Sequence, residues 1–138
     1  MPSITVPATL QSLTSAQQYL KENIPTRFKA QTSNLLLVAE ELLVNVFSYA
    51  YPDGCEGKAE IRLDVRGDTL VFTVKDWGAP FNPFVEAPAP DLTSDIESRP
   101  VGGLGIFLIK QVSEHQSYVY KDRTNTIEIS FGEKPRQL

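Results

Sequence analysis

The chain has 138 residues, of which 41% are hydrophobic and 22% charged, and its formal net charge is −4 at pH 7. This composition is ordinary for a globular protein, and the length predicts a single domain over residues 1–138 and excludes a multidomain enzyme. The acidic balance argues against a general nucleic-acid binder, which needs a positive surface. One cysteine (Cys55) and one histidine (His115) exclude an internal disulfide and a zinc cluster.

The start of the chain has no basic segment followed by an apolar run, and residues 3–20 are rich in Ser, Thr and Gln. We therefore expect neither a signal peptide nor a membrane span. A cytoplasmic protein with no nucleic-acid or membrane partner is the resulting expectation.

The first half of the chain predicts one strand and two helices. Residues 4–8 are rich in β-branched side chains and include a proline, which is typical of an edge strand. Residues 9–23 have apolar side chains at helical spacing, with Ser12 or Thr14 as the expected cap. Residues 27–50 are apolar on most of their helical surface, so we expect a helix buried on most sides.

A narrow polar stripe crosses this long apolar helix at Glu41, Asn45 and Ser48. The spacing of four places Glu41 and Asn45 on one face, one turn apart. A carboxylate and an amide together can orient a nucleophile and hold a magnesium ion, because both offer hard oxygen ligands. The alternative is a polar pair that bonds a neighbouring strand or loop, and the residues alone leave both open.

A hairpin follows. Residues 58–66 and 69–75 alternate between apolar and polar side chains, with a tight turn at Gly67. The second strand runs into Asp76-Trp77-Gly78. A carboxylate at this strand end can accept a hydrogen bond from an exocyclic amine such as that of adenine, and Gly78 would let a flat base approach the backbone. The alternative is a plain Asp-x-Gly turn.

A long irregular loop comes next. Residues 80–100 hold five of the ten prolines together with four acidic side chains, and one helical turn is expected near residues 91–96. A loop of this length in a compact domain is typical of a lid, here over about residues 82–101. Gly102-Gly103-Leu104-Gly105 then precedes a helix over about residues 106–114, where free amides suit a phosphate cradle. A flexible hinge is the alternative.

Two final strands are predicted over residues 116–121 and 125–131. The order of the elements predicts an α+β fold. We expect a two-layer sandwich with a mixed, mostly antiparallel sheet and helices on one face.

Three boxes occur in order along the chain: Glu40–Asn45, Asp76–Pro83 and Arg99–Ile106. Their order and spacing resemble the GHKL ATPase family, which includes gyrase, Hsp90, histidine kinases and MutL. The closest resemblance is to the small bacterial anti-sigma serine kinases. It covers most of the chain, from about Ile4 to Phe131.

The resemblance implies a role for each matching residue. Glu41 would be the general base, and Asn45 would ligate a magnesium ion that bridges the phosphates. The other positions would contact the nucleotide: Asp76 the adenine amine, Gly78 the base, Gly103 and Gly105 the phosphates through their amides, Arg99 a phosphate from the lid, and Thr126 the surroundings of an adenine-bound water.

The resemblance also implies an activity and partners. It predicts a serine/threonine kinase that uses ATP and Mg²⁺ and phosphorylates a small anti-anti-sigma protein of the STAS type. A sigma factor would be regulated by partner switching, and a homodimer is consistent with this class. The rival interpretation is a nucleotide-binding interaction module with little or no kinase activity, and a plain ATPase is a weaker one. The phosphoacceptor helix of histidine kinases has no counterpart in the chain, so we expect no autophosphorylation on His115.

Overall fold

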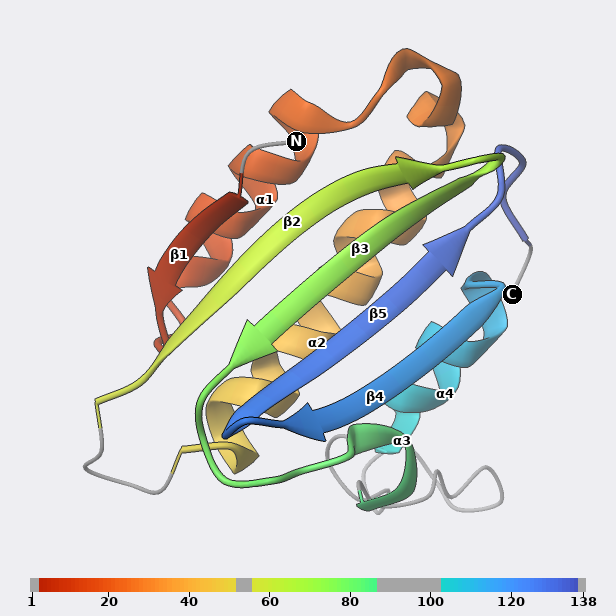
Figure 1. Cartoon of the computed structure of the whole chain (residues 1–138). Helices are drawn as coiled ribbons and strands as arrows, with labels where there is room; N and C mark the ends of the chain where they lie inside the picture. Colours follow the sequence, from red (N-terminus) through yellow and green to blue (C-terminus); the bar gives the residue numbers. More distant parts are fainter. Residues whose placement is uncertain (1–2, 52–55, 87–102, 137–138) are drawn as a thin grey trace, which may run out of the picture.

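A computed structural model describes residues 3–51, 56–86 and 103–136. Five strands form one sheet, in which every pairing is antiparallel (Figure 1). In spatial order the strands are β1 (Ser3–Pro7), β2 (Lys58–Arg66), β3 (Thr69–Asp76), β5 (Thr124–Phe131) and β4 (His115–Lys121). The expected parallel component of a mixed sheet is therefore wrong for the described strands.

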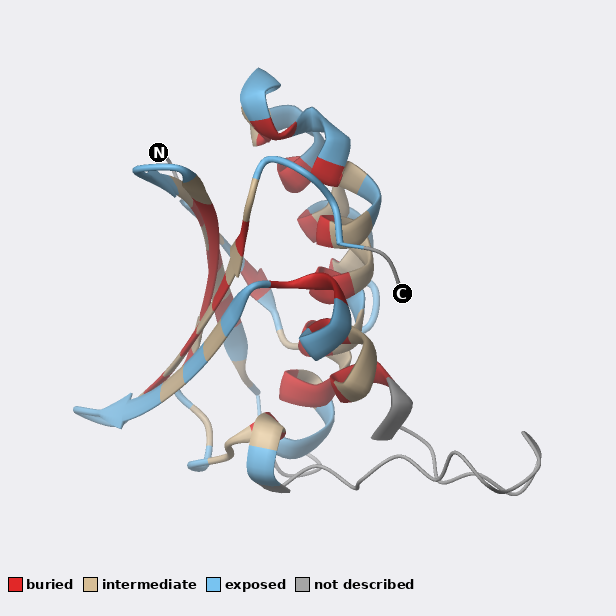
Figure 2. Ribbon diagram, turned by 90° about the vertical axis from the view of Figure 1, so that its right-hand side faces the viewer, coloured by how far each residue is buried: buried red, intermediate tan, exposed pale blue. Residues whose placement is uncertain are grey.

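The helices form the second layer. They are α1 (Ser12–Asn23), the 3₁₀ helix η1 (Thr26–Gln31), α2 (Thr32–Tyr49), the short α3 (Pro83–Glu86) and α4 (Gly103–Val112). Figure 2 shows α1, α2 and α4 stacked against one face of the sheet, while the other face carries no described helix. The predicted α+β two-layer sandwich, with helices on one face, is confirmed.

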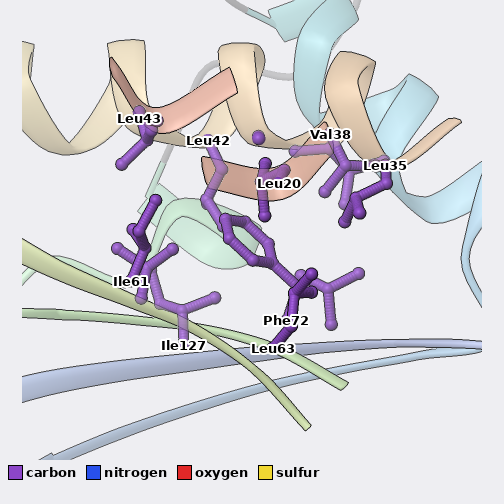
Figure 3. Close-up of a cluster of buried hydrophobic side chains, with 14 of the residues drawn as sticks. Leu20, Leu35, Val38, Leu42, Leu43, Ile61, Leu63, Phe72 and Ile127 are labelled. Atoms are coloured by element: carbon purple, nitrogen blue, oxygen red, sulfur yellow. The ribbon is translucent and has the colours of Figure 1, made fainter. Parts of the chain in front are cut away.

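The core lies between these two layers. Period-two alternation turns Ile61, Leu63 and Phe72 of the sheet toward the helices, and each is fully buried. Figure 3 shows them meeting Leu42 and other apolar side chains of α1 and α2. Burying each such side chain contributes about 1.5–3 kcal/mol. This packing holds α2, which carries the polar stripe, rigidly on the sheet.

The long helix expected over residues 27–50 divides in two. Its first part is the 3₁₀ helix η1, and α2 begins only after Gln31. The buried Gln31 amide donates to the carbonyls of Gly132 (2.8 Å) and Lys134 (3.1 Å). These bonds to a distant segment coincide with the change of helix type, and a local pattern cannot reveal them.

The expected cap of α1 is also wrong. Gln11 takes the N-cap position and makes no side-chain capping bond, while Ser12 is already the first helical residue. The Ser12 hydroxyl lies 3.2 Å from that of Thr9, and its backbone N–H donates to the Thr9 carbonyl. A backbone turn therefore starts this helix in place of a side-chain cap.

Some of the predicted segments lie partly or wholly outside the residues that the structure describes. The helical turn near residues 91–96 and most of the expected lid lie outside the described residues. Where the lid was expected to begin, α3 forms a short helix. Within the described part of the chain, no helix is both long enough and apolar enough to traverse a bilayer.

Candidate nucleotide site at one end of the sheet

The candidate site lies where α2 and β3 end and where β5 and α4 begin, at the bottom of Figure 1. The turn after β3 packs directly on the end of α2, since the Ala79 N–H donates to the Ala50 carbonyl at 2.6 Å. This contact fixes Asp76 and the polar stripe of α2 relative to each other. Residues from all three boxes therefore lie near one end of the domain.

Gly78 is required by this packing. A Cβ added at Gly78 would overlap the Ala50 carbonyl oxygen and carbon, which are backbone atoms that cannot easily move. We expected a glycine here so that a base could approach the backbone. The end of helix α2 already excludes a side chain at this position, so the junction between the turn and the helix is one reason for the glycine. The approach of a base to Gly78 stays a prediction.

The Asp76 carboxylate is 2% exposed. Its Oδ1 accepts hydrogen bonds from the Gly78 N–H at 3.0 Å and from the Asn125 amide at 2.8 Å. Among the described residues, Oδ2 receives no hydrogen bond and remains an acceptor. Burial raises the pKa of Asp76, and the two hydrogen bonds act in the opposite direction. The geometry suits a carboxylate that accepts a hydrogen bond from an exocyclic amine.

Thr126 does not join this group. In the β3–β5 register Asn125 lies opposite Asp76, and Thr126 lies opposite Lys75. Because successive side chains of a strand point to opposite faces, Thr126 faces the uncovered side of the sheet. The residue that contacts Asp76 is therefore Asn125, and the place of Thr126 near an adenine-bound water stays a prediction.

Asn125 could have been found from the sequence. It is in phase with the buried Ile127, Ile129 and Phe131, so it is a polar residue at a core-facing position of its strand. A buried amide of this kind needs polar partners. That signal favours Asn125 over its neighbour.

Glu41 and Asn45 lie on one face of α2, as their spacing predicts. Asn45 is buried, and its amide donates to the Glu41 carbonyl at 2.8 Å. This bond leaves the Asn45 Oδ1 without a donor among the described residues. Within the described residues the pair bonds no neighbouring strand, but the long loop lies largely outside them, so the alternative of a pair that bonds a strand or loop stays open.

The Glu41 carboxylate lies against the first turn of α4. A Cβ added at Gly105 would overlap the Glu41 Oε2, so only glycine leaves this carboxylate in place. Partial burial, and then the charge of Glu40, raise the pKa of Glu41. A carboxylate with a raised pKa at the start of a helix is a suitable proton acceptor near a bound anion.

The candidate site residues follow the direction of α2, from Glu41 through Asn45 to the Asp76 turn beside its end. The rise along the helix from Glu41 to Ala50, beside which the Asp76 turn lies, is about 13 Å. Asn45 falls between the two ends. An extended nucleotide with its base near Asp76 would therefore place its phosphates near Asn45 and the start of α4.

The residues present fit a magnesium ion held mainly by phosphate. Within the described ranges, no group of three or more His, Cys, Asp or Glu side chains forms a metal site. Mg²⁺ commonly takes only one or two protein oxygens and completes its shell with waters and substrate phosphates. The free Oδ1 of Asn45 is one such oxygen.

The third box is only partly described. Arg99 and Gly102 lie outside the described residues. Gly103 is the first residue of α4, so the amides of Gly103 and Gly105 belong to the first turn of that helix. First-turn amides have no partner within a helix and are free to bind an anion.

Fold and site together define a two-layer α+β domain with a nucleotide-sized row of polar groups along one helix. The histidine kinase-like ATPase domain matches residues 6–131, and the chain belongs to this family. The family is the one that contains the GHKL ATPases, and it implies ATP binding by an ATP-using enzyme. No curated protein sequence matches the chain.

Proposed function

We propose that this protein is an ATP-dependent serine/threonine kinase of the anti-sigma type. Its substrate would be a small anti-anti-sigma protein of the STAS class, and its action would release or capture a sigma factor in the cytoplasm. The observation that carries the proposal is the Glu41 carboxylate at the start of α4, one helical turn from Asn45. Transfer of phosphate to a hydroxyl requires a base that lies close to the bound phosphates, and a helix N-terminus is a typical phosphate-binding site.

In this proposal each residue has one task. Asp76 accepts the adenine amine, and the Gly103 and Gly105 amides bind phosphate oxygens. Asn45 holds the magnesium ion, which neutralises charge on the phosphates. Glu41 accepts the proton of the serine hydroxyl while that oxygen bonds to the γ-phosphorus and ADP departs.

The position of the single histidine argues for a phosphate acceptor other than the histidine that histidine kinases use. His115 is exposed at the start of β4, where it pairs with Ser130. The distance along β5 from Asn125 to Ser130 is about 17 Å, so His115 lies at the far end of the sheet from the Asp76 turn. This position favours a hydroxyl on a separate protein as the phosphate acceptor.

The test is transfer from ATP to serine. The protein is mixed with Mg-ATP carrying a labelled γ-phosphate and with a small serine-bearing antagonist of the STAS class, and phosphoserine is measured by mass spectrometry. We expect stoichiometric phosphoserine on the antagonist and none on His115. Nucleotide binding without phosphoserine on any candidate would favour the interaction module, and phosphate release to water alone would favour the plain ATPase.

A further inference from the structure

Asn125 forms side-chain hydrogen bonds with several parts of the candidate site. Its Nδ2 donates to Asp76 Oδ1 at 2.8 Å and to the Ala79 carbonyl at 3.0 Å. Its Oδ1 accepts the Tyr118 hydroxyl and, at 3.4 Å, the Phe81 N–H. The side chain is 1% exposed. All of the hydrogen-bonding positions of this amide are therefore used inside the protein.

The orientation of the amide follows from these partners. The Ala79 carbonyl can only accept, so the nitrogen of Asn125 must face it. The Tyr118 hydroxyl accepts the Phe81 N–H at 3.1 Å, which directs its own hydrogen to Asn125 Oδ1. Both ends of the network thus present the Asn125 N–H group to Asp76.

We propose that Asn125 is a positioning residue, held by Tyr118, that keeps the Asp76 carboxylate an ionised acceptor and thereby selects an amine over a carbonyl at position 6 of the purine. A donor that bonds a carboxylate favours its charged form. The charged form accepts hydrogen bonds and cannot donate one. A purine amine is therefore bound, and a purine carbonyl is repelled.

The other described neighbours of Asp76 donate no side-chain hydrogen bond to its carboxylate. Ala59 of β2 and Ala50 after α2 are apolar neighbours. Lys75 and Lys58 face the uncovered side of the sheet, where the Lys58 amine lies over the Trp77 ring. The Tyr51 hydroxyl accepts the Trp77 backbone N–H and donates its own hydrogen to the Lys58 carbonyl. Among the described residues, Asn125 is the only side chain that donates to Asp76.

This inference rests on the proposed nucleotide site. The experiment is designed so that a failure of the inference can be distinguished from a failure of the proposed site. The probes are ATP and inosine triphosphate, which differ by an amine or a carbonyl at position 6. Affinities are measured by calorimetry with Mg²⁺ from about pH 5.5 to about pH 8.5, a range in which the charge of a buried carboxyl can change. Folding of each variant is checked by thermal unfolding.

For the original protein we expect ATP to bind at least tenfold more tightly than inosine triphosphate. Asn125→Leu has nearly the same shape and no donor. This variant should weaken ATP binding about tenfold and reduce the preference for ATP over inosine triphosphate. It should also raise the pH at which ATP affinity is lost on acidification. Tyr118→Phe keeps the ring and should shift both readouts in the same direction by less, which preserves the test if Asn125→Leu fails to fold. Tyr120→Phe, on the same strand and exposed, is the matched control and should change neither.

Three results would show which part of the proposal fails. If Asp76→Asn, expected to lose tenfold to a hundredfold in ATP affinity, binds ATP normally, the adenine site itself is wrong and the proposed function loses its basis. If Asp76→Asn weakens binding but Asn125→Leu and Tyr118→Phe leave the ATP preference and the pH midpoint unchanged, this inference alone is overturned. Equal weakening of both nucleotides with an unmoved midpoint would show that Asn125 is merely structural.

Discussion

The Glu41 carboxylate lies in a position that serves chemistry better than stability. It is partly buried against α4, the charge of Glu40 raises its pKa further, and no described residue donates to it. A group in this state is a poor contributor to folding and a good proton acceptor. The same residue type one position earlier, Glu40, is exposed and offers a natural comparison.

Glu41→Gln should separate binding from transfer. The substitution preserves the shape of the side chain and removes its basicity, so we expect ATP affinity to stay within about threefold and phosphoserine formation to fall about a hundredfold or more. Glu40→Gln removes the exposed neighbouring charge but keeps the Glu41 carboxylate, so it should lower the pKa of Glu41 somewhat and reduce transfer far less than Glu41→Gln does. Single-turnover transfer and calorimetry on both variants are the measurements. Normal transfer by Glu41→Gln would remove the base from the mechanism.

Gly105→Ala tests the same carboxylate from the other side. The new methyl group would overlap Glu41 Oε2, the end of a flexible side chain, so the carboxylate should turn away while the fold persists. The Gly105 amide is retained, so we expect ATP to bind and transfer to fall at least tenfold, since misplacing a catalytic group is costly. If the Gly105→Ala protein transfers phosphate at the original rate, the position of Glu41 against α4 is irrelevant to the reaction.

Among the elements, the junction between α2 and the turn after β3 decides the geometry of the site. It joins the helix that carries Glu41 and Asn45 to the strand that carries Asp76, through the bond from Ala79 to Ala50. A change at this junction should therefore alter both the stability of the domain and the distance between the proposed base-binding and phosphate-binding ends.

Gly78→Ala should destabilise the protein by about 1–3 kcal/mol or more, because the added methyl group meets backbone atoms of Ala50. Gly132→Ala is the matched control, since its methyl group would meet only the flexible end of Glu114. We expect its effect on the free energy of unfolding to be much smaller. Urea unfolding of both variants measures the difference. Equal stabilities would mean that the junction readily accommodates a side chain.

Elements whose bounds depend on local sequence patterns were predicted more accurately than elements whose bounds depend on contacts with distant residues. The β2 strand was predicted with the bounds that the structure shows, because side-chain alternation is a local property. The division of the long helix at Gln31 was not, because it involves bonds to Gly132 and Lys134, about a hundred residues away. Helix α3, of four residues, is too short to produce a periodic pattern.

For the whole molecule, one buried carboxyl (Asp76) and one partly buried carboxyl (Glu41) link stability to pH. Glu41 and Asp76 both have a pKa raised by burial in the folded protein. In the range between the ordinary and the raised pKa, the folded state binds more protons than the unfolded state. The free energy of unfolding therefore falls as pH rises through that range, and this contribution of the two groups is lost at neutral pH.

Glu41→Gln should reveal this linkage. Without nucleotide, we expect the free energy of unfolding of the variant relative to the original to increase between about pH 4 and about pH 8, because only the original acquires the buried charge. Urea unfolding at several pH values measures the difference. Surface ion pairs such as that between Arg66 and Glu128 are common to both proteins and cancel in the comparison. A constant difference at every pH would contradict the linkage.

The sequence by itself determined the two-layer α+β fold, the order of the three boxes and the shared helix face of Glu41 and Asn45. The fold and the shared helix face depend on periodicity and on spacing within single elements, and the order of the boxes can be read directly along the chain. It also pointed to the family that residues 6–131 match. For this much, local patterns suffice, because each is repeated over many residues.

Only the tertiary structure decided which groups meet. Asn125 rather than Thr126 contacts Asp76 because the β3–β5 register pairs residues that are 49 positions apart. A shift of one residue in that register would exchange the two side chains between faces of the sheet. Gly78 is explained by a helix end, and Gly105 by a carboxylate from another helix. Such contacts depend on how complete elements pack, and no pattern within a single element contains that information.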